Sequence, residues 1–297
     1  MMKKLLHKIY QLVPMLVLLS IVFFGGVQSS PVFAEPESVQ EDPIEELPYE
    51  ENSILALNYH RVREKNFPTT LIDFMSNSKE LQIYSVYDDE FEDQMKWLKS
   101  QGANFLTLDQ AIECIETGNV PEKAVWISFD DMDQTIYDNA QPILEKYDIP
   151  ATGFVITGQV GNQNFNSISL MDLESLVELD ESGLWSFGLH TDDLHYLDEH
   201  NNSALLAASD QTVKKDTKKS QDYLDKYLEN CRTDAIAYPY GQMNDQTQVS
   251  LAEQGVRYGF TLEEKAIHNP INDFYIPRVL VSQESFERLV KSWQGFQ

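Results

Sequence analysis

Hydrophobic and polar positions divide most of the chain into short apolar runs and longer amphipathic segments. Compact apolar runs typical of buried strands fall at 54–59, 124–129, 151–157, 185–189, 235–238, 258–262 and 275–281. Apolar residues at helical spacing fall between them at 91–98, 108–115, 137–147, 173–179, 213–228 and 249–253. Strand and helix alternating in this way predict parallel βα units, and hence an α/β sheet or barrel.

The first residues of the chain have the pattern of an export signal. Residues 1–34 combine a basic start, an apolar run over 12–27 and the cleavage-type sequence Val32-Phe33-Ala34, which predicts a signal peptide. An uncleaved membrane anchor is the alternative interpretation. Residues 35–51 are acidic and contain prolines, and they predict a disordered tether before a single domain over 52–297. We therefore expect a secreted protein that stays at the cell wall or cell surface.

The formal net charge is −26, and removal of the three leader lysines would take it to −29. A field of this sign repels nucleic acid and anionic membrane surfaces, so neither is expected as a partner. It suits a polycationic partner, although a merely solvated acidic surface explains the same composition.

Two cysteines, Cys114 and Cys231, are present. Neither belongs to a CxxC pair, which argues against a thiolate metal cluster. A disulfide between them is left open by the sequence.

Four predicted strands are followed at once by unusual polar residues. These are Asn58-Tyr59-His60-Arg61, Ser128-Phe129-Asp130-Asp131, His190-Thr191-Asp192-Asp193-Leu194-His195 and Tyr238-Pro239-Tyr240-Gly241. Reactive groups gather at the carboxyl ends of strands in parallel α/β folds. The coincidence therefore predicts a functional site at this edge.

The adjacent aspartates and the histidine pair predict a metal site. Two carboxylates at the end of a buried strand repel each other unless a cation lies between them, although the pair could instead cap the following helix. The histidines, five residues apart, converge only across a turn. Together they form a mixed nitrogen and oxygen donor set suited to zinc, cobalt or nickel, with positions left open for water and substrate.

Four further residues are candidates for contact with substrate. His60 ends the first strand and titrates near neutrality, which suits a catalytic acid, although a hydrogen-bonded structural histidine is an equal alternative. His268, in a proline-flanked loop, is the other candidate acid. Tyr240 and Trp185 could form a wall that stacks against a sugar, although buried aromatic residues more often belong to a core.

These motifs resemble the polysaccharide deacetylase (NodB-homology) family of carbohydrate esterases. The family's Thr-Phe-Asp-Asp motif is matched by Ser128-Phe129-Asp130-Asp131. Its His-Ser/Thr-x-x-His motif is matched by 190–195 with one extra residue, and its Pro-Tyr motif by Tyr238-Pro239-Tyr240. Runs such as Ile149-Pro150-Ala151-Thr152-Gly153-Phe154 and Tyr275-Ile276-Pro277-Arg278 resemble the intercellular adhesin deacetylases of this family.

The resemblance implies a distorted (β/α) barrel of the NodB-homology type. It implies that Asp131, His190 and His195 hold a divalent metal, zinc in the first place, and that Asp130 is the base. The arginine usual before the Pro-Tyr motif is replaced by Ala237, and Arg278 is our candidate for the missing partner of the base. Met132 stands where the family commonly has glycine.

The resemblance also implies the reaction. It is the metal-dependent removal of acetyl groups from extracellular poly-β-1,6-N-acetylglucosamine, which makes a biofilm polymer partly cationic, by an enzyme expected to be a monomer. A deacetylase of peptidoglycan or chitin would share the chemistry, and a non-catalytic polysaccharide-binding protein is an alternative of another class. A binding protein would have no use for Asp130 beside the ligand Asp131.

Overall fold

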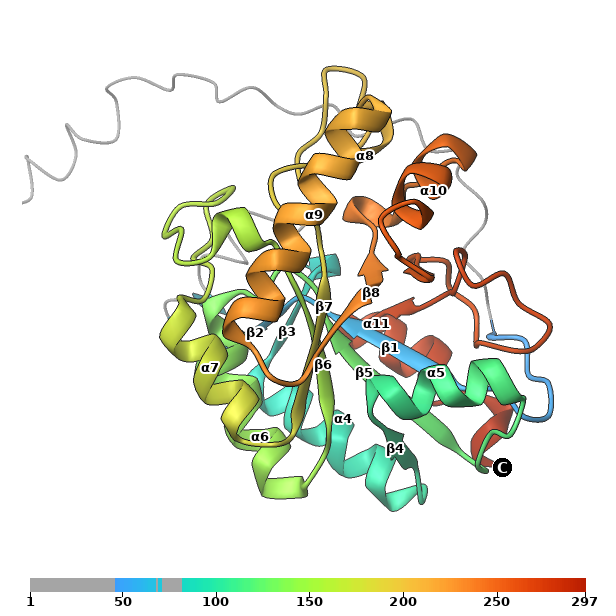
Figure 1. Ribbon diagram of the computed structural model, residues 1–297. Coiled ribbons are helices and arrows are strands. Elements are labelled where there is room, and N and C mark those ends of the chain that lie inside the picture. Colours follow the sequence, from blue (N-terminus) through green and yellow to red (C-terminus); the bar gives the residue numbers. More distant parts are fainter. Residues whose placement is uncertain (1–45, 68, 71–81) are drawn as a thin grey trace, which may run out of the picture. The chain divides into compact units, whose positions relative to one another are not determined.

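A computed structural model of the chain describes residues 46–67, 69–70 and 82–297 (Figure 1). The predicted signal peptide over 1–34 and most of the predicted tether over 35–51 lie outside these residues. Within them, no helix combines the length and the apolar character that a membrane crossing requires.

The strands and helices follow the alternation that the sequence predicts. The strands are β1 (Leu55–Tyr59), β2 (Arg61–Arg63), β3 (Ser85–Tyr87), β4 (Asn104–Leu106), β5 (Ala124–Phe129), β6 (Ala151–Val155), β7 (Trp185–Leu189), β8 (Cys231–Ala237), β9 (Tyr258–Phe260) and β10 (Val279–Leu280). The helices are α4 (Asp88–Ser100), α5 (Leu108–Thr117), α6 (Gln141–Tyr147), α7 (Leu173–Glu181), α8 (Ala204–Ala207), α9 (Asp210–Tyr227), α10 (Asp245–Ala252) and α11 (Gln283–Ser285). Short 3-10 turns include Thr157–Gln159 and Pro239–Gly241.

The main sheet is parallel and curled. Its strand order is β10-β1-β5-β6-β7-β8-β9, and β4 pairs with the first half of β5. Ile276, on the segment that leads into β10, bridges Phe260 of β9, and its N–H donates to the carbonyl oxygen of Gly259 at 2.9 Å. This bridge links the two ends of the strand order. The result is the predicted distorted barrel, in a single domain.

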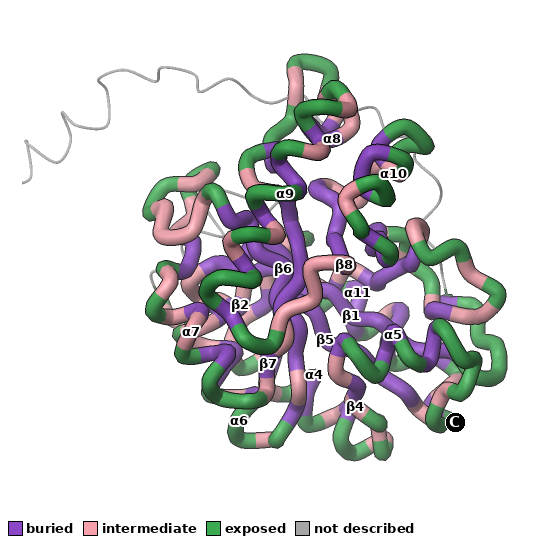
Figure 2. The backbone as a smooth tube through the Cα atoms, viewed as in Figure 1, coloured by how far each residue is buried: buried purple, intermediate pink, exposed green. Residues whose placement is uncertain are grey.

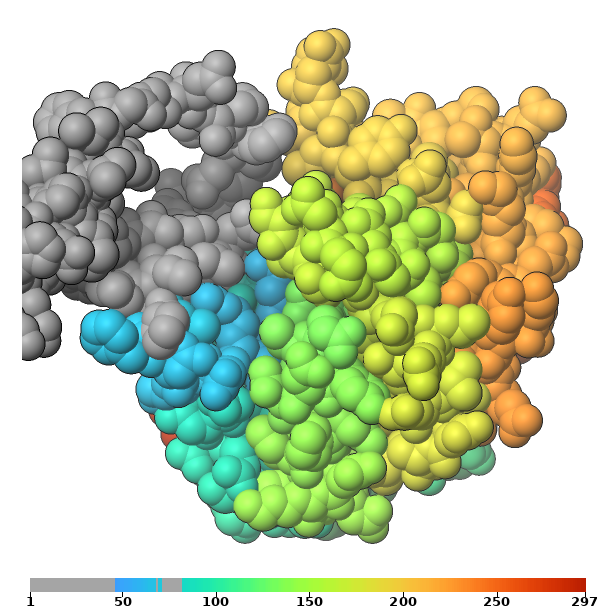
Figure 3. Space-filling model, turned by 90° about the vertical axis from the view of Figure 1, so that its left-hand side faces the viewer, coloured from blue at the N-terminus to red at the C-terminus, as the bar shows by residue number. Residues whose placement is uncertain are grey.

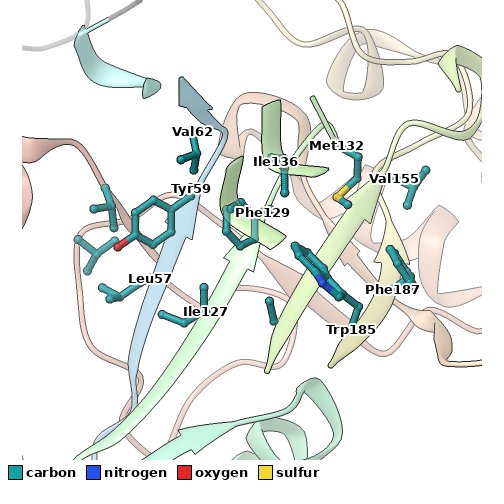
Figure 4. Packing of buried hydrophobic residues seen from close by; sticks show 14 of the residues in the cluster. Leu57, Tyr59, Val62, Ile127, Phe129, Met132, Ile136, Val155, Trp185 and Phe187 are labelled. Atoms are coloured by element: carbon teal, nitrogen blue, oxygen red, sulfur yellow. The ribbon is translucent and has the colours of Figure 1, made fainter. Parts of the chain in front are cut away.

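The period of two along each strand separates two apolar clusters. Leu55, Leu57 and Tyr59 of β1 belong to the larger cluster, whereas Ala56 belongs to the smaller one. Figure 4 shows part of the larger cluster, with the side chains of β1, β5 and β7 packed side by side. The smaller cluster lies on the opposite face of the strands. It includes Trp126 and the buried face of α5.

Helices and loops shield the strands from solvent. Figure 2 shows buried residues along β1, β5, β6 and β7, whereas the outer turns of the helices are exposed. Figure 3 shows one outer face of the molecule. The segments coloured green to yellow, which include α6 and α7, lie side by side on this face. The shielding explains why these strands read as continuous apolar runs instead of alternating ones.

Local signals set the helix boundaries. Thr107 begins α5 with a capping box in which its hydroxyl accepts from the N–H of Gln110. Gly118 ends the helix in a left-handed conformation, with φ of 72°. Ser209 caps α9 by accepting from the N–H of Thr212. These caps satisfy N–H and C=O groups that a helix end leaves unpaired.

The end of the predicted tether is part of the folded domain, which corrects the boundary at residue 52. Leu47 is buried in the larger apolar cluster, and the ring of Tyr49 lies 5.7 Å from that of Trp293. The acidic composition concealed this because only a few of these residues are apolar. The two cysteines are free thiols, so Cys114 and Cys231 do not pair.

Candidate active site

The parallel register brings the predicted polar residues to one edge of the sheet. Tyr59 of β1 pairs with Phe129 of β5, so that His60 and Asp130 follow at the same level. Leu189 at the end of β7 pairs with Val155 of β6, and His190 comes next. The carboxyl ends of the strands therefore carry the site, as the sequence predicts.

The three predicted metal ligands converge on one point. Oδ1 of Asp131 lies 3.2 Å from Nε2 of His190 and 3.1 Å from Nε2 of His195. All three residues are buried, and their candidate ligand atoms lie within 4.8 Å of one another. The two imidazole rings are 4.7 Å apart, centroid to centroid. The turn after β7 thus brings together two histidines that a straight strand would separate.

The donor set fits a divalent cation. Nδ1 of His190 donates to the carbonyl oxygen of Ala237 at 2.8 Å, so Nε2 of the neutral ring presents a lone pair to the Asp131 carboxylate, and only the protonated ring donates to it. Two acceptors held 3.2 Å apart repel each other unless a positive charge lies between them. Ligands of one tetrahedral zinc ion, each about 2.0–2.1 Å from it, are about 3.3 Å apart. The residues present therefore fit the metal that the family implies.

The ionisation of the site favours the same conclusion. Burial lowers the pKa of His190, but the hydrogen bond to Asp131 and the nearby carboxylate charges raise this pKa more. Burial raises the pKa of Asp131, yet the charge of His195 and hydrogen bonds from both histidines bring it well below its usual value. Both shifts show a pocket that binds positive charge, whether a proton or a metal ion.

A tight turn aims Asp131 into the site. The N–H of Met132 donates to the carbonyl oxygen of Asp130 at 2.8 Å, and Asp131 and Met132 have φ of 67° and 60°. Positive φ is costly for residues with a Cβ, which accounts for the glycine common in the family at position 132. Met132 instead buries its side chain, and its sulfur lies against Gly153, where an added Cβ would clash with it.

Asp130 is held by Arg278, as the sequence analysis expects. Nη1 and Nη2 of Arg278 donate to the two carboxylate oxygens at 2.7 and 2.8 Å. The guanidinium is fully buried, 5.1 and 5.8 Å from the ring centroids of Phe154 and Phe260. Burial raises the pKa of Asp130, but the charge and hydrogen bonds of Arg278 outweigh burial and leave this pKa below its usual value. Asp130 is therefore a carboxylate at neutral pH.

His60 lies at the same edge and is buried. Its ring is 4.9 Å from that of Tyr84, centroid to centroid. Burial lowers the pKa of His60 to about 4, against the opposing effect of the charges of Asp131 and Asp130. His60 is thus neutral at neutral pH. His268 is far from this site because Ile267 pairs with Ile54, at the amino end of β1, and His268 itself bonds Glu50 at 2.8 Å. The structure removes His268 as a candidate acid.

The two predicted sugar-stacking residues lie in different places, Tyr240 beside His195 and Trp185 in the core. The ring of Tyr240 lies 4.9 Å from that of His195, and Tyr240 lines a cavity of about 320 Å³ together with Gly241, Thr261, Leu262 and Glu263. Trp185 is the first residue of β7 and is buried, and its indole N–H donates to Oε1 of Gln141 at 2.5 Å. Figure 4 shows it packed in the core beside Phe129 and Phe187. The prediction for Trp185 was wrong because the amino end of a strand is remote from this edge.

Two residues around the histidine pair were not predicted from the sequence. The ring of Phe165 lies 5.8 Å from that of His195, centroid to centroid. It begins a tight turn in which Phe165 and Ile168 exchange both backbone hydrogen bonds. Asp216 of α9 binds the backbone between the two histidines. A carboxylate on the buried face of a helix was the available signal for Asp216, whereas no motif marks Phe165.

Fold and site together define an α/β barrel protein with a divalent-metal donor set beside an arginine-held carboxylate, the arrangement of a metal-dependent hydrolase. Residues 117–259 match the family model described as polysaccharide deacetylase. The poly-beta-1,6-N-acetyl-D-glucosamine N-deacetylase of Staphylococcus aureus is 50% identical over 259 residues, covering 87% of this chain and 89% of that protein. The chain therefore belongs to the polysaccharide deacetylase family, and it is an enzyme.

Further relatives support the same family membership. The enzyme of the same name from Staphylococcus epidermidis is 51% identical over 251 residues, covering 84% of this chain and 86% of that protein. The solved structure of IcaB from Ammonifex degensii matches with a TM-score of 0.69 and 31% identity, over 81% of this chain and 96% of that one. The Streptococcus pyogenes deacetylase PplD, solved in complex with acetate, matches with a TM-score of 0.65 and 29% identity, over 78% and 93%.

Proposed function

We propose that this chain is a metal-dependent N-deacetylase of extracellular poly-β-1,6-N-acetylglucosamine. It hydrolyses the acetamide of a sugar unit, releasing acetate and leaving an amine on the polymer. The observation that carries the proposal is the position of Asp130, an ionised carboxylate held by Arg278 next to the Asp131, His190 and His195 donor set. The names of the relatives supply the substrate.

We assign the metal to Asp131, His190 and His195, with zinc as the expected ion and cobalt or nickel as alternatives. A divalent ion bound there supplies positive charge that polarises a carbonyl oxygen and lowers the pKa of water. His190 is held for this purpose by its bond to Ala237, since a second hydrogen bond fixes the ring and its tautomer.

Asp130 is the proposed base. Its carboxylate takes a proton from the attacking water, and the paired guanidinium of Arg278 keeps it ionised and correctly oriented. His60 is the proposed acid, which passes a proton to the departing amine. Because its pKa is about 4, His60 holds no extra proton at neutral pH, so we propose that Asp130 hands on the proton it has taken from the water and that His60 delivers this same proton to the amine. Tyr240 is the proposed sugar contact, beside His195 at the cavity.

Two substitutions test the division of roles between base and ligand. Asp130→Asn should lower kcat by at least about 10²-fold, because general base catalysis contributes that much or more, and should leave metal binding intact. His190→Ala should lose both activity and metal. Acetate release and metal content of the purified proteins provide the two measurements. Full activity in Asp130→Asn would refute the assignment of the base.

Defined oligomers test the substrate. We expect acetate release from β-1,6-linked oligomers of N-acetylglucosamine, abolished by a chelator and restored by zinc. Faster release from β-1,4-linked oligomers would identify a chitin-type or peptidoglycan-type deacetylase instead. Binding of the polymer without acetate release would identify a polysaccharide-binding protein.

We further propose that the enzyme is exported and remains at the cell wall or cell surface. The basic and apolar leader over 1–34 supports export. Fractionation of cells into medium, wall and cytoplasm, with the N-terminus of the mature protein determined, tests the leader and its cleavage.

A further inference from the structure

The loop between the two histidines departs from regular strand geometry. Four residues, Thr191 to Leu194, separate His190 from His195. The family motif has one residue fewer between its histidines. Thr191 has φ of 70°, a costly conformation for a β-branched residue. A strained loop that carries two ligands needs other contacts to keep the ligands in place.

One carboxylate binds this loop by its backbone. Oδ1 of Asp216 accepts from the N–H of Asp192 at 2.9 Å, and Oδ2 accepts from the N–H of Asp193 at 2.7 Å. Successive N–H groups next to a left-handed residue form a concave site for an anion. The Asp216 side chain fills that site and fixes the peptide unit midway between the histidines.

Asp216 belongs to the buried face of its helix. Val213, Asp216, Thr217, Ser220 and Leu224 are the buried residues of α9. Asp216 itself is only 7% exposed, so its carboxylate is not solvated by water as an acidic residue on a helix surface would be. Burying a carboxylate is costly unless hydrogen bonds compensate. The two loop N–H groups provide part of that compensation, although burial still raises the pKa of Asp216 to about 6.

The other side of the loop is held by the turn after β6. The N–H of Thr157 donates to the carbonyl oxygen of Thr191 at 3.1 Å, and the N–H of Gly158 donates to that of Asp192 at 3.0 Å. Lys219 of α9 bonds the Asp192 side chain at 2.8 Å. The loop backbone is therefore hydrogen-bonded to the 157–158 turn on one side and to α9 on the other. Asp216 makes the hydrogen bonds on the α9 side.

We propose that Asp216 is a positioning residue that sets the metal affinity of the site by holding the loop in its binding conformation before the metal arrives. The inference rests on the proposed function, in which His190 and His195 are ligands. Without Asp216, part of the metal-binding free energy would be spent on ordering the loop. Loss of such an outer contact lowers metal affinity about 10–100-fold.

A matched control exists elsewhere in the fold. Asp180 of α7 is also buried, and its carboxylate accepts from two successive backbone N–H groups, those of Glu229 at 2.6 Å and Asn230 at 3.0 Å. Those residues precede β8, at the end of the strand away from the metal site. Asp180→Asn therefore removes an equivalent structural contact without touching the histidine loop.

The test compares Asp216→Asn with Asp180→Asn and the wild type in the full chain. Zinc affinity is measured by competition with a chromogenic chelator, and stability by urea unfolding of the metal-free proteins. We expect both variants to lose stability, and only Asp216→Asn to bind zinc about 10–100-fold more weakly, with kcat recovered at saturating zinc. Equal zinc affinities in the two variants would overturn the inference. A wild type that binds no divalent metal would instead overturn the proposed function.

Hydrogen exchange of the metal-free wild type gives a second readout that needs no substitution. The amides of Asp192 and Asp193 should be protected because both donate to Asp216 before any metal is bound. Free exchange of both amides, with protection only after zinc is added, would show that the metal orders the loop and would contradict the inference.

Discussion

At the scale of single residues, the site depends on a buried ion pair between Asp130 and Arg278. Removing Asp130 and Arg278 from water costs several kcal/mol per ion, which is offset only by good geometry and further hydrogen bonds. The pair has both, since Nη1 also donates to Ser128 at 3.2 Å and Nε to the carbonyl oxygen of Thr261 at 3.3 Å. Arg278 thus supplies the partner of the Asp130 carboxylate, in place of the arginine that Ala237 replaces.

The pKa of His60 predicts how stability depends on pH. The folded-state pKa is about 4, below the ordinary histidine pKa of 6.5, so the unfolded chain takes up a proton first as the pH falls. The contribution to stability is therefore fully present above pH 6.5 and is lost as the pH falls towards 4. A shift of this size corresponds to about 3 kcal/mol.

His60→Gln removes this dependence. Between pH 7.5 and 4.5, metal-free wild type should lose up to about 3 kcal/mol more stability than His60→Gln, as measured by urea unfolding in a chelator. His200→Gln removes an exposed imidazole and controls for the change in histidine content. The same loss of stability in wild type and His60→Gln would show that His60 titrates equally in both states.

At the scale of elements, the apolar pattern predicts the long strands and the segments that contain β9 and β10, but it misses β2, β3 and β4. The runs at 54–59, 124–129 and 185–189 correspond to β1, β5 and β7 almost residue for residue. Strands of three residues, such as β3 and β4, are too short to show a period of two. β8 begins at Cys231, before the predicted apolar run at 235–238. The first four residues of β8 are only partly buried, so they did not show as an apolar run.

Loops that carry the ligands were predictable in position but not in conformation. The His190 and His195 spacing predicts a turn, yet nothing local indicates that Gly158 lies against it. A Cβ on Gly158 would lie far inside van der Waals contact with the carbonyl oxygen of Asp192. That contact joins residues about 35 positions apart, so only the assembled sheet reveals it.

Gly158→Ala should therefore displace the histidine loop. Overpacking of this kind costs about 1–3 kcal/mol of stability, and we expect zinc affinity to fall with it because the backbone at Asp192 must move. Gly183→Ala is the control, since φ there is 74° and no atom lies within 4 Å of the added Cβ. It should lower stability without changing zinc affinity. A Gly158→Ala protein with wild-type affinity would show that the loop tolerates the shift.

At the scale of the whole molecule, the site exists only because strands distant in sequence share one edge. Arg278 meets Asp130 across 148 positions of sequence, through the strand order that places β10 and β5 on either side of β1. The sequence supplied the residue types at each strand end, and the parallel fold predicted that they meet. The predicted run 185–189 already placed Trp185 at the amino end of its strand, away from this edge, and Trp185 lies in the core whereas Tyr240 lies at the site.

The net charge of the whole chain predicts that binding of the product polymer depends on salt. At a net charge of −26, the enzyme attracts the ammonium groups that each turnover leaves on the polymer, and salt screens this attraction over about 8 Å at physiological ionic strength. Raising the salt from about 0.05 to 0.5 M should weaken binding of partly deacetylated polymer severalfold, with little effect on turnover of a short acetylated oligomer. Fully acetylated polymer, which is uncharged, is the matched control for chain length. If salt weakened binding of both polymers equally, the acidic surface would have no part in holding the product, because screening can act only where the ligand carries charge.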